Sequence, residues 1–368
     1  MKTVRRLLYG EVLVSVALVT IGFATLFYFF DFVEELQAVT KHAATGYTAM
    51  QAMLYVGLIL PSHLYELLPI TVLIGTIFVM ARLAQSSEFT ILRTSGLGPW
   101  MALRMLLALG IVFVACTFAI GDYVAPWSGK TAQLLKSRYQ GDVTVGRTGA
   151  WLKERQAYSH YAVNVGALAP DASMRDVRIY EFDNKGLLVS LTEAASGQFR
   201  SDDAWLLSQV ERAEFVYAQD QSAHVDRTRS DTFRWHTQIS AEMVATAVLK
   251  PERMGTIDLF QYIRHLDANG QTAQKYEIQF WKKVFYPLSC LVMVVLALPF
   301  AYFHFRSGSV ATYVFGGVMA GISFVLLNNV LADLGALRGW LPWVTAALPG
   351  IIYSVISLSA FGWLVLRR

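Results

Sequence analysis

Charged residues are scarce in this sequence of 368 residues. Lys, Arg, Asp and Glu together make up 16% of it, whereas average soluble domains contain about a quarter. Hydrophobic residues account for 55%, which excludes a disordered chain and argues against an ordinary soluble enzyme. The net charge of +4 is too small to indicate a nucleic-acid partner.

Cysteine is nearly absent, since Cys116 and Cys290 are the only two. Each lies in an apolar run, where a thiol behaves as a small hydrophobic group. One pair cannot build a disulfide scaffold, and no Cys-x-x-Cys motif occurs. The 7 histidines are scattered without the spacing of a metal site, so we expect this chain to bind no metal and no other cofactor.

Motifs for catalysis are missing as well. The tripeptide Gly129-Lys130-Thr131 lacks the first glycine of a phosphate-binding loop, because that position is Val124. No Gly-x-Ser-x-Gly nucleophile elbow occurs. Glu66 lies inside an apolar run, but that run contains no second carboxylate with which it could form a catalytic dyad. We therefore expect a chain that is not itself an enzyme.

Long apolar runs are what the sequence has in abundance. A bilayer core about 30 Å thick takes roughly 20 helical residues to cross. Such runs form two groups of three: Val12–Phe30, Leu54–Ala81, Pro99–Ile120, Val284–Phe303, Val310–Leu331 and Pro342–Leu366. The first is too long for a signal peptide and has no small-residue cleavage site after it, so we expect a retained span.

Basic residues are distributed unevenly over the short loops and the chain ends. One side has Lys2, Arg5, Arg6, Arg82, Arg93, Arg104, Arg306, Arg367 and Arg368. The short loops of the other side have only Lys41 and Arg338. Because the Lys and Arg residues of short loops stay in the cytosol, we expect both termini to be cytosolic and the long segment between the third and fourth runs to lie outside.

That long segment follows a different pattern. Its alternating runs, such as Val177–Phe182, end at turn signals such as Asp183–Gly186. Alternation of this kind predicts half-buried antiparallel strands, and several at this spacing predict a β-sandwich or jelly roll. We expect transmembrane helices one to three at 1–122, an all-β domain at 123–255, and an interfacial helix with transmembrane helices four to six at 256–368.

The loop between the second and third runs, at 82–96, is too long for a tight turn. Its apolar residues make it amphipathic, and Gly96 could end a helix. We expect a short cytosolic helix at about 83–95 that docks a motor protein, with Glu88 offering its carboxylate to an arginine of that motor. An interfacial helix without a partner is the alternative.

Several short motifs match one known family when they are taken together. They are Gln85-Ser86-Ser87-Glu88 with Thr94-Ser95-Gly96, the segments 119–126 and 279–288, Gly321–Phe324 and Leu348–Gly350. With the layout of the whole chain, they resemble the LptF/LptG permeases, the membrane subunits of the lipopolysaccharide-export ABC transporter. One departure is that the outer end of the first span has no lysine before Lys41.

The resemblance implies a multi-pass protein of the bacterial inner membrane with a periplasmic β-domain. Such a permease extracts lipopolysaccharide from the inner membrane and passes it to a periplasmic bridge towards the outer membrane. The implied partners are a second, LptF-like permease subunit, an LptB-like ATPase dimer and an LptC-like bridge protein. ATP and Mg would be used by the ATPase and not by this chain.

The same reasoning gives candidate site residues. Contact with the ATPase is expected from Glu88, Ser87, Phe89 and Arg93. Acyl chains need an apolar path, because exposed apolar area costs about 25 cal/mol per Å² in water. Candidates for lining it are Phe27, Phe30, Leu67, Leu68, Phe324 and Leu327. Candidates for holding lipid phosphates are Lys41, Lys130, Lys136 and Arg138. Gly317 and Gly321 would allow close packing of the fifth span.

Ordinary roles are the alternative for each of these residues: helix packing, contact with lipid, or a solvated charge. Three other functions also remain open at this point. A mechanotransmitting ABC membrane subunit would share the layout without moving lipid through its own cavity. A membrane-anchored sensor or scaffold would bind a ligand through its β-domain, and an intramembrane enzyme would depend on Glu66.

Overall fold

The computed structural model describes residues 2–94, 96–140, 143–144, 149–156, 159–169, 171, 173–200, 204–217, 223–241, 243–244, 251, 254–302 and 310–366. The chain forms two compact units. We call them the helical unit (Met1–Leu36, Val56–Gly129 and Glu277–Arg368) and the β unit (Gln37–Tyr55 and Lys130–Tyr276).

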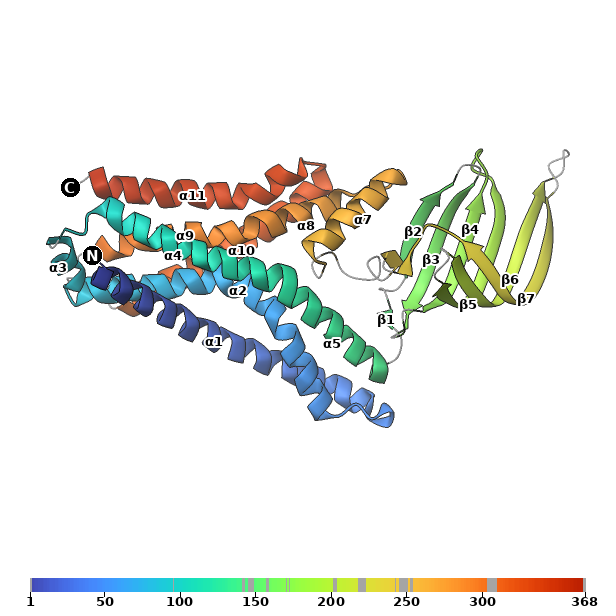
Figure 1. Ribbon diagram of the computed structural model, residues 1–368, viewed down its shortest axis with the longest axis horizontal. Helices are drawn as coiled ribbons and strands as arrows, with labels where there is room; N and C mark the ends of the chain where they lie inside the picture. Colours follow the sequence, from blue (N-terminus) through green and yellow to red (C-terminus); the bar gives the residue numbers. More distant parts are fainter. Residues whose placement is uncertain are drawn as a thin grey trace. The chain divides into compact units, whose positions relative to one another are not determined.

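Among the described residues, 6 helical stretches are long and apolar enough to cross a membrane, which confirms the predicted three-plus-three arrangement (Figure 1). Apolar runs of this length become helices because a bilayer offers the backbone no hydrogen-bond partner other than itself. The first two spans are α1 (Lys2–Lys41) and α2 (Ala49–Gln85), the third is α4 (Pro99–Ala119) with η2 (Ile120–Val124) and α5 (Ala125–Gln140), the fourth is α8 (Gln274–Phe285) with η4 (Tyr286–Leu288), α9 (Ser289–Ala297) and η5 (Leu298–Tyr302), and the last two are α10 (Val310–Arg338) and α11 (Pro342–Leu366).

Irregular segments occur in the second, third and fourth spans, and the last span, α11, also contains a proline, Pro349. In α2, Pro61 and Pro69 each lack the backbone N–H that a regular helix uses. The third span takes π geometry over η2, and the fourth takes 3₁₀ geometry over η4, which contains Pro287. Such departures bend helices or expose backbone groups to side chains.

These irregular segments meet at one place in the helical unit. The rings of Tyr65 and Tyr286 lie 5.1 Å apart, and the Tyr286 hydroxyl donates to the carbonyl oxygen of Glu66 at 2.5 Å. Lys283 Nζ donates to the carbonyl oxygen of Gly121 in the π-helix at 3.1 Å. A Cβ on Gly121 would overlap the Tyr65 ring, so only glycine fits there.

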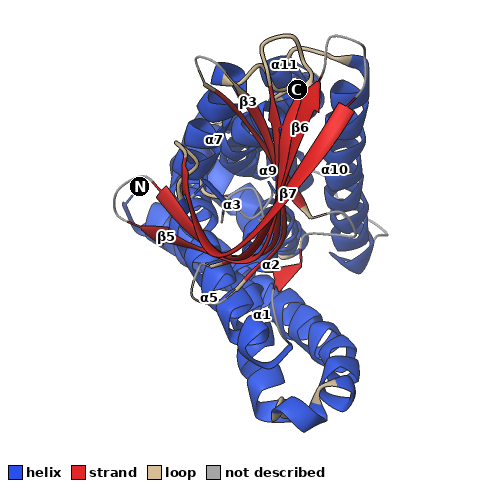
Figure 2. Cartoon of the chain, turned by 90° about the vertical axis from the view of Figure 1, so that its right-hand side faces the viewer, coloured by secondary structure: helices blue, strands red, loops and turns tan. Residues whose placement is uncertain are grey.

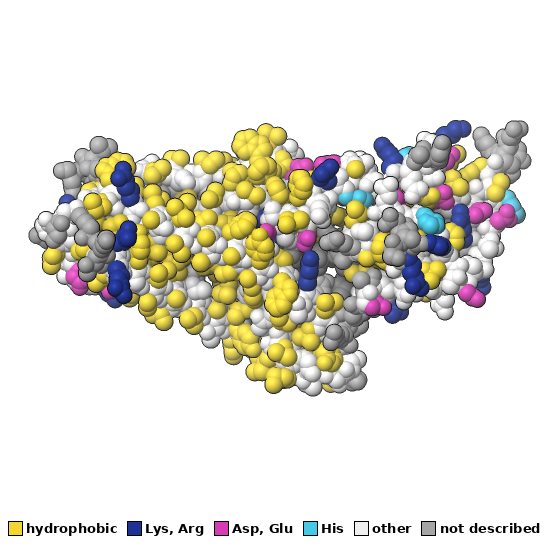
Figure 3. Space-filling model, in the orientation of Figure 1, with side chains coloured by type: hydrophobic (Ala, Val, Ile, Leu, Met, Phe, Trp, Pro, Cys, Tyr) yellow, Lys and Arg dark blue, Asp and Glu magenta, His cyan; other side chains and the backbone are white. Residues whose placement is uncertain are grey.

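Burial differs sharply between the spans. In α2, 78% of the apolar stretch is buried within the chain, whereas the value is 17% for both α1 and α10. Figure 3 shows hydrophobic side chains covering the visible face of the helices, with Lys and Arg on both sides of this hydrophobic region. The α2 helix is thus the centre of the helical unit, and α1 and α10 leave most of their apolar surface available to lipid or to another subunit.

In the β unit, seven strands lie within the described part of the chain and form one antiparallel sheet, in the order β1-β3-β4-β5-β6-β7 with β2 paired to β3. The strands are β1 (Val143–Thr144), β2 (Ala150–Arg155), β3 (His160–Leu168), β4 (Met174–Phe182), β5 (Leu188–Arg200), β6 (Ala204–Tyr217) and β7 (Ala223–His236). Burial alternates along β2, as the period-two pattern predicts for strands with one buried face. This confirms an all-β domain between the third and fourth spans.

The sheet is rolled, as Figure 2 shows. Four strand spacings separate β3 from β7, or about 19 Å in a flat sheet. Yet the rings of Tyr161 on β3 and Trp235 on β7 lie 6.3 Å apart. The buried carboxylate of Glu154 on β2 accepts from the backbone N–H of Gln238 at 2.9 Å and from the Thr237 hydroxyl. Side chains therefore close the roll around a core shared by both ends of the sheet.

The boundary between the third span and the β-domain differs from the one expected. Residues 125–140, expected to lie in the β-domain, extend the third span as the helix α5, because this stretch has no period-two alternation. The first strand therefore begins at Val143. After the sheet, α7 (Thr256–Ala268) forms where a helix was expected.

Candidate functional site

The loop between the second and third spans contains the short helix α3 (Glu88–Thr94). It is shorter than the expected 83–95, because residues 83–85 complete α2. The chain turns between the two helices at Ser87, whose φ is 61°, and leaves α3 at Gly96, whose φ is 101°. Left-handed residues of this kind end helices, so α3 is a separate element with a turn at each end.

One face of α3 is exposed and the other is packed. Glu88 and Ile91 lie three positions apart, so they share the exposed side, and 62% of Ile91 is accessible. Phe89 is only 2% exposed and belongs to the main core of the helical unit. An exposed carboxylate beside an exposed aliphatic side chain suits a protein partner that supplies an arginine and an apolar contact.

The packed face of α3 rests on Tyr302, the last residue of η5. The Phe89 ring meets the Tyr302 ring edge-on, with centroids 5.0 Å apart. The Arg93 guanidinium lies 5.4 Å from the centre of the same ring. Of the four residues expected to contact an ATPase, Glu88 and Ser87 are exposed, whereas Phe89 and Arg93 contact the chain itself.

The sequence reasoning did not single out Ile91 or Tyr302 as site residues. The amphipathic pattern contained a signal for Ile91, because it lies three residues after Glu88 on the same helical face. No pattern in the sequence pairs Tyr302 with a helix some two hundred positions earlier. That contact depends on tertiary packing alone.

The basic residues expected at the outer boundary have different environments. Lys130 Nζ lies 3.2 Å from the Asp258 carboxylate, and Lys136 Nζ lies 4.4 Å above the ring of Tyr55. Lys41 is exposed at the end of α1. The side chain of Arg138 lies outside the described residues. The two lysines of α5 therefore tie that helix to other parts of the β unit.

The six candidate cavity residues fall into two groups. Phe324 is buried between Tyr286 and Tyr353, with ring centroids 6.4 Å and 5.2 Å away, and Leu68 is buried too. Phe30 is 59% exposed, and Phe27, Leu67 and Leu327 are half-buried. The structure thus places Phe324 and Leu68 in the packed interior and leaves Phe30 on the surface.

Near Phe27, α1 and α2 are joined by a contact between a histidine and an aspartate. His63 Nε2 lies 2.8 Å from Asp31 Oδ2, and the imidazole ring lies 5.1 Å from the Phe27 ring. Both polar side chains are about a quarter exposed. Phe27 of α1 therefore lies beside α2 at this point.

The two glycines of the fifth span lie where α10 crosses α2. A Cβ on Gly317 would lie 2.6 Å from Ile77 Cδ1, and one on Gly321 would lie 2.8 Å from Ile70 Cγ2. These distances are shorter than ordinary van der Waals contacts. The glycines therefore bring α10 against the central span of this chain.

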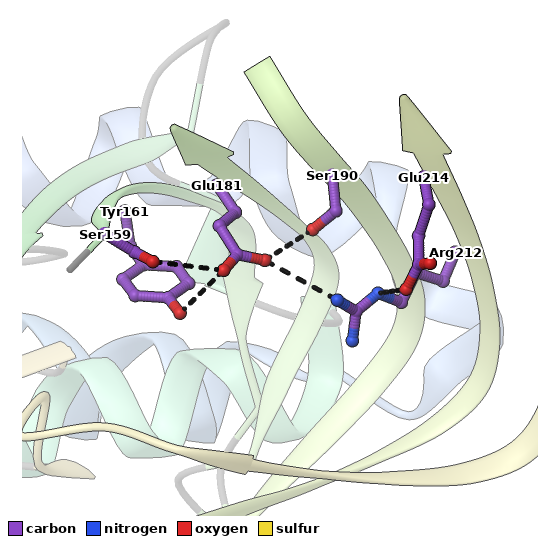
Figure 4. Close-up of polar contacts among 6 residues, drawn as sticks. All are labelled: Ser159, Tyr161, Glu181, Ser190, Arg212 and Glu214. Carbon is purple, nitrogen blue, oxygen red and sulfur yellow. Dashed lines mark hydrogen bonds and ion pairs between the residues drawn. The ribbon is translucent and has the colours of Figure 1, made fainter. Parts of the chain in front are cut away.

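The β unit contains a polar cluster, drawn in Figure 4. Glu181 accepts hydrogen bonds from Tyr161 Oη at 3.1 Å and from Ser190 Oγ at 2.7 Å, and Arg212 Nη2 lies 3.5 Å from the same carboxylate. Burial, followed by the Glu181 charge, raises the pKa of Tyr161. Each of these groups has a partner, so the cluster orders one end of the roll and offers no acid–base pair poised for catalysis.

Within the described ranges, no set of three or more His, Cys, Asp and Glu side chains is arranged to hold a metal ion.

Comparison with known proteins extends these observations. The chain is 28% identical over 340 residues to LptG, a lipopolysaccharide export system permease protein of Escherichia coli K12. The aligned region covers 92% of this chain and 90% of the relative. It is 26% identical over the same length to LptG of Haemophilus influenzae. The short motifs of this sequence also resemble LptG more than LptF. The model of the lipopolysaccharide export system permease LptF/LptG family matches residues 6–367. With six apolar helices, an inserted β unit and this match, the chain belongs to the LptF/LptG family of permeases.

Proposed function

We propose that this chain is a permease subunit of an ATP-driven transporter that extracts lipopolysaccharide from the inner membrane and passes it to a periplasmic bridge. The family match over nearly the whole chain carries this proposal. Relatives that share its length are named as permease proteins of lipopolysaccharide export. The apolar helices give such a subunit its place in the membrane.

A second, LptF-like permease subunit completes the lipid cavity in this proposal. Support comes from α1 and α10, whose apolar stretches are only 17% buried within the chain. Phe30 offers an exposed aromatic side chain on α1. Two such half-bundles facing one another would enclose a space lined by apolar side chains, which acyl chains need outside the bilayer.

An LptB-like ATPase dimer, which hydrolyses ATP with Mg as its cofactor, binds α3 from the cytosol in this proposal. The start of α1, the end of α11 and α3 lie at the same end of the helical unit (Figure 1). This arrangement supports the expected orientation with both termini in the cytosol. Glu88 would pair with an arginine of the ATPase, and Ile91 would add apolar contact beside it.

The β unit is periplasmic in this orientation and hands the lipid to an LptC-like bridge protein. Lys41 and Arg138 remain candidates for contact with lipid phosphates. Lys130 and Lys136 would have to share their charges with Asp258 and Tyr55 respectively. Because these partners compete with an added anion, Lys130 and Lys136 would hold a lipid phosphate more weakly than unpaired lysines would.

The decisive experiment uses the chain co-purified with its natural partners. The complex is placed in vesicles containing lipopolysaccharide, and ATP-dependent transfer of the lipid to an added acceptor protein is measured. We expect transfer that requires ATP and an ATPase in the purified complex. Absence of an ATPase would favour a sensor or scaffold instead.

A crosslinking arm separates a permease from a mechanotransmitting subunit. A photoreactive amino acid at Phe30 or Leu327 should form adducts with lipopolysaccharide that diminish when ATP is added. A subunit that moves no lipid through its own cavity would give no such adducts. Enzymatic activity of the isolated chain on a membrane substrate, abolished by Glu66→Gln, would instead indicate an intramembrane enzyme.

A further inference from the structure

The helix α3 can act on the rest of the chain in two ways, through the backbone connections at its ends and through its packed face. At both connections, Ser87 and Gly96, the backbone is left-handed. The regular hydrogen-bond ladder stops at such residues, so a rotation of α3 changes their dihedral angles before it moves α2 or α4. The backbone connections are therefore poor routes for transmitting a push.

The packed face of α3 provides a direct route. Phe89 and Arg93 lie four residues apart, on one side of the helix, and both contact the ring of Tyr302. Edge-to-face and cation–π contacts depend on orientation as well as on distance. A tilt of α3 therefore weakens both contacts unless Tyr302 moves with it.

Tyr302 is well placed to pass such a movement onward. It is 5% exposed and ends η5, which directly continues α9 in the fourth span. Leu298, one turn earlier, is fully buried in the same core cluster as Phe89. Because protein interiors are close-packed, displacement of Tyr302 displaces η5 and α9 rather than being lost in empty space.

We propose that Tyr302 is the positioning residue through which α3 moves the fourth span in each ATP cycle. The proposal rests on the proposed function, because it requires an ATPase that binds α3. It assigns different tasks to two residues: Glu88 holds the ATPase, and Tyr302 passes its movement to the membrane-spanning part. Loss of Tyr302 should therefore uncouple transport from hydrolysis without releasing the ATPase.

The test compares variants of the intact complex in lipopolysaccharide-containing vesicles. Tyr302→Leu removes the aromatic ring but keeps an apolar side chain, and Tyr302→Phe keeps the ring. Phe300→Leu is the matched control, since Phe300 lies in the same segment but its ring contacts Tyr313 of α10 at 6.0 Å. Arg93→Gln probes the contact from the side of α3 and keeps the tyrosine in place.

Three quantities are measured for each variant: ATPase retained on purification, hydrolysis rate, and lipid transferred per ATP. We expect Tyr302→Leu to retain the ATPase and to hydrolyse ATP at the normal rate. The lipid transferred per ATP should fall by about tenfold, within the usual range for coupling between sites. Tyr302→Phe should restore transfer, Phe300→Leu should match the wild type, and Arg93→Gln should show a partial loss.

Unchanged transfer per ATP in both Tyr302→Leu and Arg93→Gln would overturn the proposal. An equal loss in Phe300→Leu would overturn it as well, because the effect would then reflect general packing. If Tyr302→Leu does not assemble, the comparison of Arg93→Gln with Phe300→Leu decides alone. Failure of the proposed function looks different, because the wild-type complex would then lack an ATPase or transfer no lipid.

Discussion

The substitution Gly75→Ala should loosen the first span from the second. A Cβ at Gly75 would lie 2.8 Å from both Cα and the backbone nitrogen of Val16, and backbone atoms cannot rotate away. The helices would have to separate, which stretches the Ser15 Oγ bond to the Gly75 carbonyl (3.1 Å) and the bond between Thr20 and Thr71 (2.9 Å). Overpacking costs about 1–3 kcal/mol and each interhelical bond about 0.6 kcal/mol, so the total is about 2–4 kcal/mol.

The measurement is unfolding of the purified protein in mixed micelles as the fraction of denaturing detergent increases. The control is Gly22→Ala on α1, where an added Cβ meets no atom within 4 Å. Gly22→Ala should leave the unfolding free energy unchanged or slightly higher, because alanine favours helix. Equal midpoints for the two variants would refute the argument that the close crossing at Gly75 holds α1 in place.

The remaining predictions concern α3 and the β unit. Glu88→Arg should reduce the ATPase that co-purifies with the complex, because it places a cation opposite the expected arginine, and unchanged association would exclude Glu88 from docking. Trp205→Ala, at a fully buried side chain, should destabilise the roll by about 3–5 kcal/mol, measured as faster limited proteolysis, whereas Trp151→Ala at a half-exposed position should have little effect. Burial lowers the pKa of His265 from 6.5, so the unfolded chain binds a proton at a higher pH than the folded chain does, and stability should fall as the pH drops below that value. The measurement is thermal unfolding at about pH 7.5 and at about pH 5.5. The wild type and the control His224→Gln should both lose stability at the lower pH, and His265→Gln should lose less.

The spans and the strands could be predicted because each depends on local composition. Runs such as Val12–Phe30 are helical wherever they insert, and alternation such as that in Val177–Phe182 places one face inward in any sheet. The continuation of the third span through α5 could not be predicted in this way. Its sequence is neither continuously apolar nor alternating, so only its contacts, such as Lys136 over Tyr55, show where it lies.

The candidate site shows the same limit. The motif predicts that Glu88 faces a partner, and the structure shows that Glu88 is exposed at the start of α3, but the orientation of its neighbours needed helical geometry. Adjacent residues on a helix point in directions about 100° apart, so Glu88 and Phe89 cannot both face one partner squarely. The contact of Tyr302 with α3 could not be predicted, because its distance in sequence from α3 leaves no periodic pattern. Long-range packing decides such contacts.

The place where the Tyr65 ring covers Gly121 has a consequence for how this membrane protein can vary. At that point a side chain of the second span fills the space that a Cβ of the third would occupy, and the fourth span donates from Lys283 to the same glycine. Adding one methyl group to Gly121 would therefore disturb three spans at once. Gly22, with no neighbour within 4 Å, can accept the same methyl group without moving anything. For these two glycines, the space around the Cβ position decides whether a methyl group is tolerated, although the residue type is the same.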